Sequence, residues 1–79
     1  MRLDAIRAHL RAWTEIVYCS EWLGYLPYGA YQWIEAAGRD VSAGMPAGWT
    51  LDDLLVLERE GFLERLAAEE GRITFRVRA

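Results

Sequence analysis

The chain has few residues of the types that carry out catalysis, and none of them stands in a catalytic arrangement. His9 is its one histidine and Cys19 its one cysteine. A lone histidine is more often a surface or boundary residue than a base, and a cysteine in an aromatic-rich stretch is usually a buried structural thiol. Four hydroxyl residues, Thr14, Ser20, Ser42 and Thr50, also stand outside any recognisable nucleophile motif. The sequence therefore predicts a protein that is not an enzyme.

Metal and cofactor sites are not predicted either. The chain has no CxxC pair, no second histidine and no glycine-rich phosphate loop, which are the patterns that hold zinc or nucleotides. Its acidic residues are numerous, but none of them forms a paired motif that can be told apart from the carboxylates of an ordinary solvent-exposed surface. We therefore expect no metal site and no cofactor.

Length and composition indicate one small domain over residues 1–79. Of these 79 residues 53% are hydrophobic, and the net charge is −3. A single cysteine cannot form an internal disulfide, which favours a reducing compartment. No apolar stretch approaches the ~20 residues that span a bilayer, so we expect a soluble, cytoplasmic protein. The net acidity argues against DNA binding, because phosphate contacts supply most of the affinity for nucleic acids.

Apolar spacing predicts a first helix from Arg2 to about Trp22. Within it, apolar residues recur every three or four positions, as on the buried face of a helix. They are Leu3, Ile6, Leu10, Trp13 and Val17. The basic residues of this segment lie off that face, and we expect them to be solvated.

A second helix is expected after a connector that contains Gly24 and Pro27. Pro27 suits the first turn of a helix, where its missing N–H does no harm. The helix is expected to run to about Ala37, with Tyr31 and Ile34 among its inward residues, and to end at Gly38.

A third helix is predicted to begin at Thr50, whose hydroxyl can act as the N-cap. Asp52 and Asp53 follow directly and place negative charge at the positive end of the helix dipole. Gly61 can adopt the left-handed conformation that ends a helix in a Schellman motif. The sequence therefore predicts a capped helix that stops abruptly.

Two alternatives stay open for residues 62–70. They can continue the third helix, in which case Gly61 costs about 1 kcal/mol in the helix interior. They can also form the first strand of a hairpin. The segment that follows alternates as a strand does, with Ile73, Phe75 and Val77 on one side and polar residues on the other.

Several of these features together resemble a winged helix-turn-helix domain of the PadR and MarR-like families. The resemblance rests on Pro46–Leu51, Leu54–Leu55, Leu57–Glu58, Gly61–Glu64 and Arg72–Val77, with a looser match at Tyr28–Ile34. It implies a small α+β winged helix, with three helices followed by a two-stranded β-hairpin wing. It also implies a recognition helix that reads DNA and wing arginines that contact phosphates, here Arg72, Arg76 and Arg78. These arginines can instead pair with Glu64 across the hairpin or face water.

The predicted recognition helix is acidic where the family offers basic and polar side chains to DNA. From Thr50 to Gly71 there are seven acidic residues and two arginines, which leaves −5. Such a surface opposes the phosphates of a DNA groove. Aromatic residues also cluster around the Gly24–Pro27 connector, and Tyr and Trp are enriched in interface hot spots. The residues predicted to bind a protein partner are therefore Asp52, Asp53, Glu60, Trp22, Tyr25 and Tyr28.

We therefore expect a non-enzymatic binding module that contacts a protein partner with a basic surface. An acidic surface on a nucleic-acid-binding scaffold suits an inhibitor encoded by a phage or mobile element against a host nucleic-acid-handling complex; anti-CRISPR proteins are examples. The alternative is a dimeric winged-helix transcriptional regulator, with Arg72, Arg76 and Arg78 on DNA and the first helix at the dimer interface. A third hypothesis is a structural subunit whose aromatic residues bury against a larger assembly.

Overall fold

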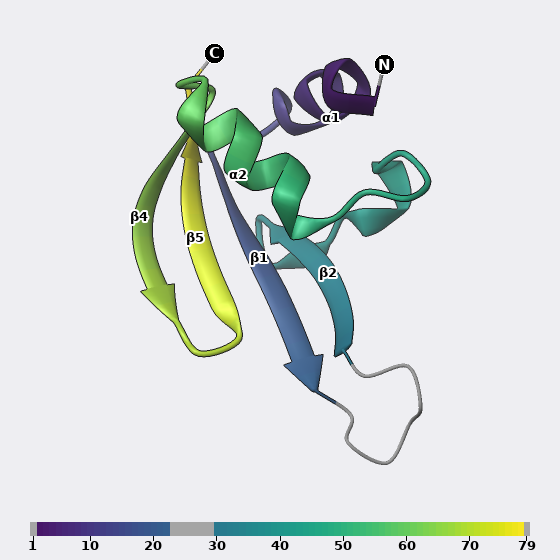
Figure 1. Cartoon of the computed structure of the whole chain (residues 1–79), viewed down its shortest axis with the longest axis vertical. Coiled ribbons are helices and arrows are strands. Elements are labelled where there is room, and N and C mark those ends of the chain that lie inside the picture. The colour runs from purple at the N-terminus through teal and green to yellow at the C-terminus, as the bar shows by residue number, and fades with distance from the viewer. Residues whose placement is uncertain (1, 23–29, 79) are drawn as a thin grey trace.

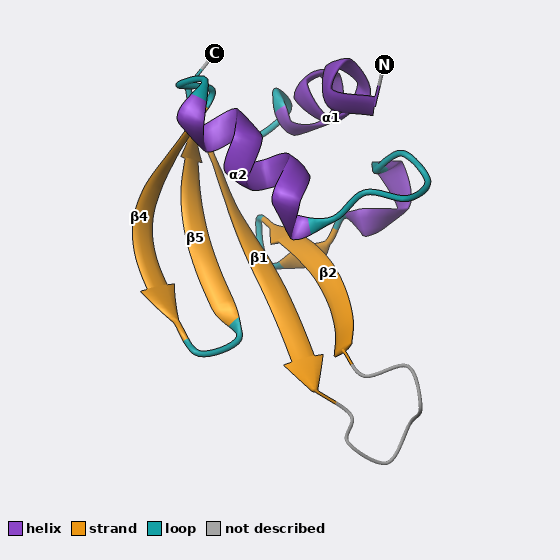
Figure 2. Cartoon of the chain, in the orientation of Figure 1, coloured by secondary structure: helices purple, strands orange, loops and turns teal. Residues whose placement is uncertain are grey.

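Over residues 2–22 and 30–78, which the computed structural model describes, the chain forms two α-helices and a five-stranded antiparallel sheet (Figures 1 and 2). The elements in chain order are α1 (Arg2–Leu10), β1 (Glu15–Trp22), β2 (Ala30–Ala36), β3 (Arg39–Asp40), a 3₁₀ turn (Ser42–Gly44), α2 (Leu51–Arg59), β4 (Leu63–Glu69) and β5 (Arg72–Val77). The strand order is β3-β2-β1-β5-β4, so β1 lies at the centre of the sheet.

The predicted winged helix, with three helices and a two-stranded wing, is wrong. The first helix ends at Leu10 rather than near Trp22, and β2 occupies residues 30–36, where a second helix was expected. The expected β-hairpin is present, but its two strands belong to the five-stranded sheet and do not form a separate wing. Among the described residues, no helix is long and apolar enough to cross a membrane.

Strand β1 forms where a helix was predicted because its apolar residues fit the spacing of a helix and also the alternation of a strand. Val17 continues the helical spacing of the segment before it, but it also alternates with Ile16 and Tyr18 as in a strand. β-branched and aromatic residues favour the strand, and β1 pairs with β2 on one side and β5 on the other. Ile16 is consequently fully buried, whereas Val17 lies half-buried on the opposite face of the sheet.

Two glycines predicted to end helices have positive φ angles, but only one of them ends a helix. Gly61 (φ 87°) follows α2, where Phe62 N–H donates to Leu57 O at 3.0 Å and Gly61 N–H to Glu58 O at 3.1 Å. This is the predicted Schellman motif. Gly38 (φ 77°) instead lies in the tight turn between β2 and β3, because the segment before it is a strand.

The hairpin alternative for the segment after Gly61 is confirmed. Strand β4 pairs with β5 from Leu63 opposite Val77 onward, with an irregularity in the register between Arg65 and Ala67. The alternation predicted for β5 also holds, since Phe75 is fully buried while the polar residues beside it face the other side. The Schellman motif therefore turns the chain directly from α2 into the sheet.

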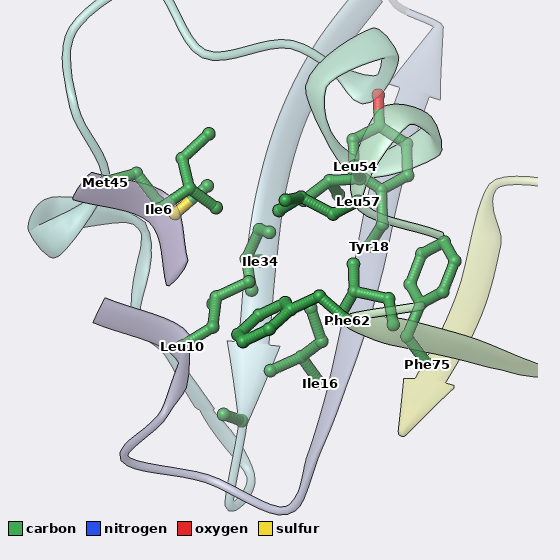
Figure 3. Packing of buried hydrophobic residues seen from close by; sticks show 12 residues of the cluster. Ile6, Leu10, Ile16, Tyr18, Ile34, Met45, Leu54, Leu57, Phe62 and Phe75 are labelled. Carbon is green, nitrogen blue, oxygen red and sulfur yellow. The ribbon is translucent and has the colours of Figure 1, made fainter. Parts of the chain in front are cut away.

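The core lies between the two helices and one face of the sheet (Figure 3). Both helices and four strands contribute fully buried side chains, so one continuous cluster holds α1, α2 and the sheet together. Its fully buried members labelled in Figure 3 are Ile6, Leu10, Ile16, Ile34, Leu54, Leu57 and Phe75. The opposite face of the sheet has neither described helix on it, and we call it the open face.

Candidate functional site

Asp53, predicted to contact a partner, instead caps the helix to which it belongs. Its side chain is only 9% exposed and pairs with Arg2 at 3.0 Å between Oδ2 and Nε. Asp53 Oδ2 also accepts a hydrogen bond from the backbone N–H of Thr50 at 2.9 Å. The carboxylate thus satisfies a free donor at the helix start and ties α1 to α2.

The other acidic residues around α2 divide into paired and free ones. Glu60 pairs with Arg7 of α1, and Glu58 pairs with Arg65 of β4 at 3.0 Å. Asp52 is exposed and has no ion pair among the described residues. Most of the negative charge that the sequence assigned to a partner surface on α2 is therefore balanced by arginines of the same chain.

Replacing Asp53 with alanine is expected to lower the free energy of unfolding by about 2 kcal/mol, since it removes a helix cap and a part-buried charge-assisted hydrogen bond. The adjacent Asp52 is the matched control, because it carries the same charge at the same helix end but is exposed. Asp52→Ala is expected to cost about 0.5 kcal/mol. Urea unfolding followed by circular dichroism measures both values, and equal losses would contradict the capping role.

The predicted aromatic contact residues lie outside the described part of the structure. Tyr25 and Tyr28 fall between β1 and β2 in residues 23–29, and Trp22 ends β1, with its side chain also outside the description. Their predicted role in binding a partner stays a prediction.

The three arginines predicted to touch DNA phosphates are each engaged with a glutamate. Arg76 and Arg78 pair with Glu64 at 3.2 and 3.5 Å, which is the cross-hairpin pairing that the sequence left open. Arg72 lies 3.6 Å from Glu35 of β2. Glu35 therefore balances Arg72, whereas Arg76 and Arg78 share the one carboxylate of Glu64, which balances only one of their two charges.

The open face of the sheet gathers the unbalanced negative charge of the protein. Antiparallel partners point to the same side, so the strand registers assign six acidic residues and two arginines to this face. Arg78, which follows β5, also reaches Glu64 on this face, so the balance is −3. The acidic residues are Glu15, Glu21, Glu35, Asp40, Glu64 and Glu69, and the arginines are Arg72 and Arg76. Glu15, Glu21 and Glu69 have no ion pair among the described residues.

Two aromatic rings stand on the open face beside these carboxylates. Tyr31, predicted to point inward from a helix, is 56% exposed. Its ring packs on that of Trp33 with 5.3 Å between centroids and a tilt of 34°. Trp33 Nε1–H donates to Glu35 Oε2 at 2.8 Å, which fixes the orientation of the indole. Sequence reasoning missed this pair because it placed both residues on a helix; alternation of Tyr31, Trp33 and Glu35 with Gln32 and Ile34 was the available signal.

Cys19 lies on the open face yet is only 1% exposed. Its cross-strand neighbours are Trp33 and Arg72, whose long side chains flank a small thiol. Burial raises the pKa of the Cys19 thiol above its ordinary 9.0, and the Glu35 carboxylate raises this pKa further, while the Arg72 guanidinium lowers it. The predicted buried structural thiol is confirmed, and the raised pKa keeps it protonated and unreactive near neutral pH.

The raised pKa of Cys19 predicts a loss of stability in alkali. Because the thiol ionises less readily in the folded state, its contribution is complete below the unfolded pKa and disappears as the pH rises through the folded pKa. The free energy of unfolding is therefore expected to fall above about pH 9, and to fall less steeply in Cys19→Ala. Urea titrations across this pH range test the expectation, and identical slopes for the two proteins would contradict it.

His9 serves packing rather than chemistry. Its Nε2 lies 2.9 Å from the carbonyl oxygen of Val41, and its ring packs edge-on against Trp13 with 5.1 Å between centroids. A side chain on Gly44 would collide with this ring, since a Cβ there would lie 2.1 Å from His9 Cε1. In the described residues no three histidine, cysteine or acidic side chains are grouped so as to hold a metal ion.

The open face also has a shallow hollow of about 280 Å³ at the end where β2 turns into β3. It is lined by Glu15, Val17, Glu35, Ala36, Ala37, Gly38 and Arg72. The hollow is small, open and mixed in charge, so it is a shallow depression in the open face rather than an enclosed ligand pocket.

No family model matches the chain, and neither a curated protein nor a solved structure matches it. The family resemblance therefore remains a prediction from the residues, and the fold that it implied is corrected by the five-stranded sheet.

Proposed function

We propose that the protein is a non-enzymatic binding module, and that it binds a basic surface of a partner protein through the open face of its sheet. The single observation that supports this proposal is the charge of that face. It holds six of the twelve acidic residues but only three of the nine arginines, when Arg78, which pairs with Glu64, is counted with Arg72 and Arg76. The rest of the chain therefore has six acidic residues and six arginines, and is neutral in sum.

The proposal moves the binding surface away from α2, where the sequence had suggested it. Asp53 and Glu60 are paired with Arg2 and Arg7, and a partner would have to compete with these arginines. The free carboxylates of the open face meet no such competition among the described residues. The electrostatic field of an uncompensated negative surface raises the association rate of a cationic partner and orients the partner as it approaches.

The DNA-binding alternative has lost its structural support. The helix expected to read the major groove belongs to a fold with two described helices and a five-stranded sheet. Phosphates approaching Arg72, Arg76 or Arg78 would also meet the glutamates that pair with them. The expected dimer contact through the first helix is weakened as well, because its buried residues Ile6 and Leu10 pack in the chain's own core.

Among binding modules, we propose an inhibitor of a host nucleic-acid-handling complex, of the kind that phages or mobile elements encode. Proteins that handle nucleic acids present arginine and lysine side chains to phosphates. An acidic sheet face is complementary to such a surface and can occupy it in place of the nucleic acid.

Fluorescence anisotropy with three labelled probes tests the proposal: an arginine-rich peptide, a glutamate-rich peptide of the same length, and duplex DNA. We expect the protein to bind the arginine-rich peptide at low salt, to bind it less tightly at physiological salt because the contacts are screened, and to leave the other two probes unbound. Binding of DNA, or no binding of the arginine-rich peptide at low salt, would overturn the proposal.

A further inference from the structure

The aromatic pair of the exposed Tyr31 and the half-buried Trp33 gives the open face a local chemistry beyond its charge. Tyr31 is 56% exposed on a strand whose other face is buried in the core. Glu21 of β1 is the direct cross-strand partner of Tyr31, so both side chains point out from the same face. Glu21 is exposed and has no ion pair among the described residues. An exposed aromatic ring and a carboxylate are therefore cross-strand neighbours on the open face.

We propose that this place binds an arginine side chain of the protein partner, with the guanidinium stacked on Tyr31 and paired with the carboxylate of Glu21. This inference rests on the proposed function and deepens it, because it names the side chain that the partner must supply. Trp33 completes the platform behind Tyr31, and its hydrogen bond to Glu35 holds the indole in place.

Arginine fits this arrangement better than lysine does. The guanidinium is planar, stacks on aromatic faces, and can donate two parallel hydrogen bonds to one carboxylate. The lysine ammonium is a more strongly hydrated point charge and cannot stack. A lysine ammonium is also attracted to an aromatic ring, so the difference comes from the planar stacking and the second hydrogen bond of the guanidinium, for which we expect roughly a fivefold difference in affinity. The proposed site therefore discriminates between two side chains of equal charge, which a general acidic surface does not.

Two peptides of equal length and charge, one of arginine and glycine and the other of lysine and glycine, test the inference with the full chain. Wild-type protein is expected to bind the arginine peptide about fivefold more tightly than the lysine peptide. Tyr31→Leu and Glu21→Gln should each bring this ratio close to one. Glu69→Gln is the matched control, because it removes one charge from the same face at the far strand β4, and it should weaken both peptides alike.

Each outcome separates this inference from the function on which it rests. If neither peptide binds wild-type protein, the proposed function fails as well. Equal binding of both peptides, or an unchanged ratio in Tyr31→Leu with an unchanged melting temperature, overturns the arginine site alone. If single-stranded DNA competes with the arginine peptide, the aromatic rings bind a nucleic acid instead. If the protein self-associates and Tyr31→Leu abolishes this, the rings bind a second copy of the chain. Either result overturns the arginine site.

Discussion

Replacing Ile16 with alanine is expected to lower the free energy of unfolding by about 3 kcal/mol, a large fraction of the stability of a small domain. Ile16 has no exposed surface and packs in the cluster shown in Figure 3. Its truncation removes buried methyl groups and leaves a cavity between β1 and the helices. The neighbouring substitution Val17→Thr is expected to cost less than about 1 kcal/mol, because Val17 is half-buried on the open face and threonine suits a strand equally well.

The comparison between these two neighbours tests the fold as well as the core. The helical spacing predicted for the first segment makes Val17 a core residue and does not include Ile16 in the buried face. In the sheet, Ile16 is the core residue and Val17 lies half-buried on the open face. Urea unfolding of both variants, followed by tryptophan fluorescence, measures the two costs. A loss for Val17→Thr as large as that for Ile16→Ala would contradict β1 as the central strand.

Reversing two charges on the open face is expected to weaken binding of the arginine-rich peptide about 30-fold relative to the same reversal elsewhere. The open-face variant is Glu15→Lys with Glu21→Lys. The matched variant is Asp4→Lys with Asp52→Lys on the two helices. Both change the net charge from −3 to +1, so a difference between them reports position rather than total charge. Each misplaced lysine is expected to cost about 1 kcal/mol through lost attraction and new repulsion.

The matched variant also tests the earlier assignment to α2. Asp52 is the member of the predicted acidic set that is exposed and has no ion pair among the described residues. If α2 were the binding surface, Asp4→Lys with Asp52→Lys would lose the most affinity. Circular dichroism and melting temperatures control for damage to the fold, since Asp4 pairs with Arg7 and Asp52 lies at the start of α2.

Local features of this chain could be predicted from the sequence where short-range chemistry decides the structure. The cap at Thr50 and the left-handed Gly61 fix both ends of α2, because each depends on residues within one turn. The alternation of β5 was equally clear. The choice between hairpin and helix after Gly61 was left open by propensity, and the backbone hydrogen bond from Phe62 to Leu57 resolves it.

The sheet could not be predicted because its central pairing is not local. Strand β1 lies between β2 and β5, and its register with β5 joins Ile16 to Phe75 across most of the chain. Val17 fitted a helical stripe equally well, so only the partners of β1 decide its conformation. Once residues 30–36 were taken as a helix, Tyr31 was placed inward, and the open face with its aromatic pair could not be seen.

Mapping the bound peptide on the protein by amide chemical shifts tests most directly whether the open face is the binding surface. The account predicts that titration with the arginine-rich peptide perturbs β1, β2 and the indole N–H of Trp33, while the amides of α2 stay unchanged. Saturable perturbations centred on α2 around Asp52, with Tyr31 and Trp33 unaffected, would contradict it.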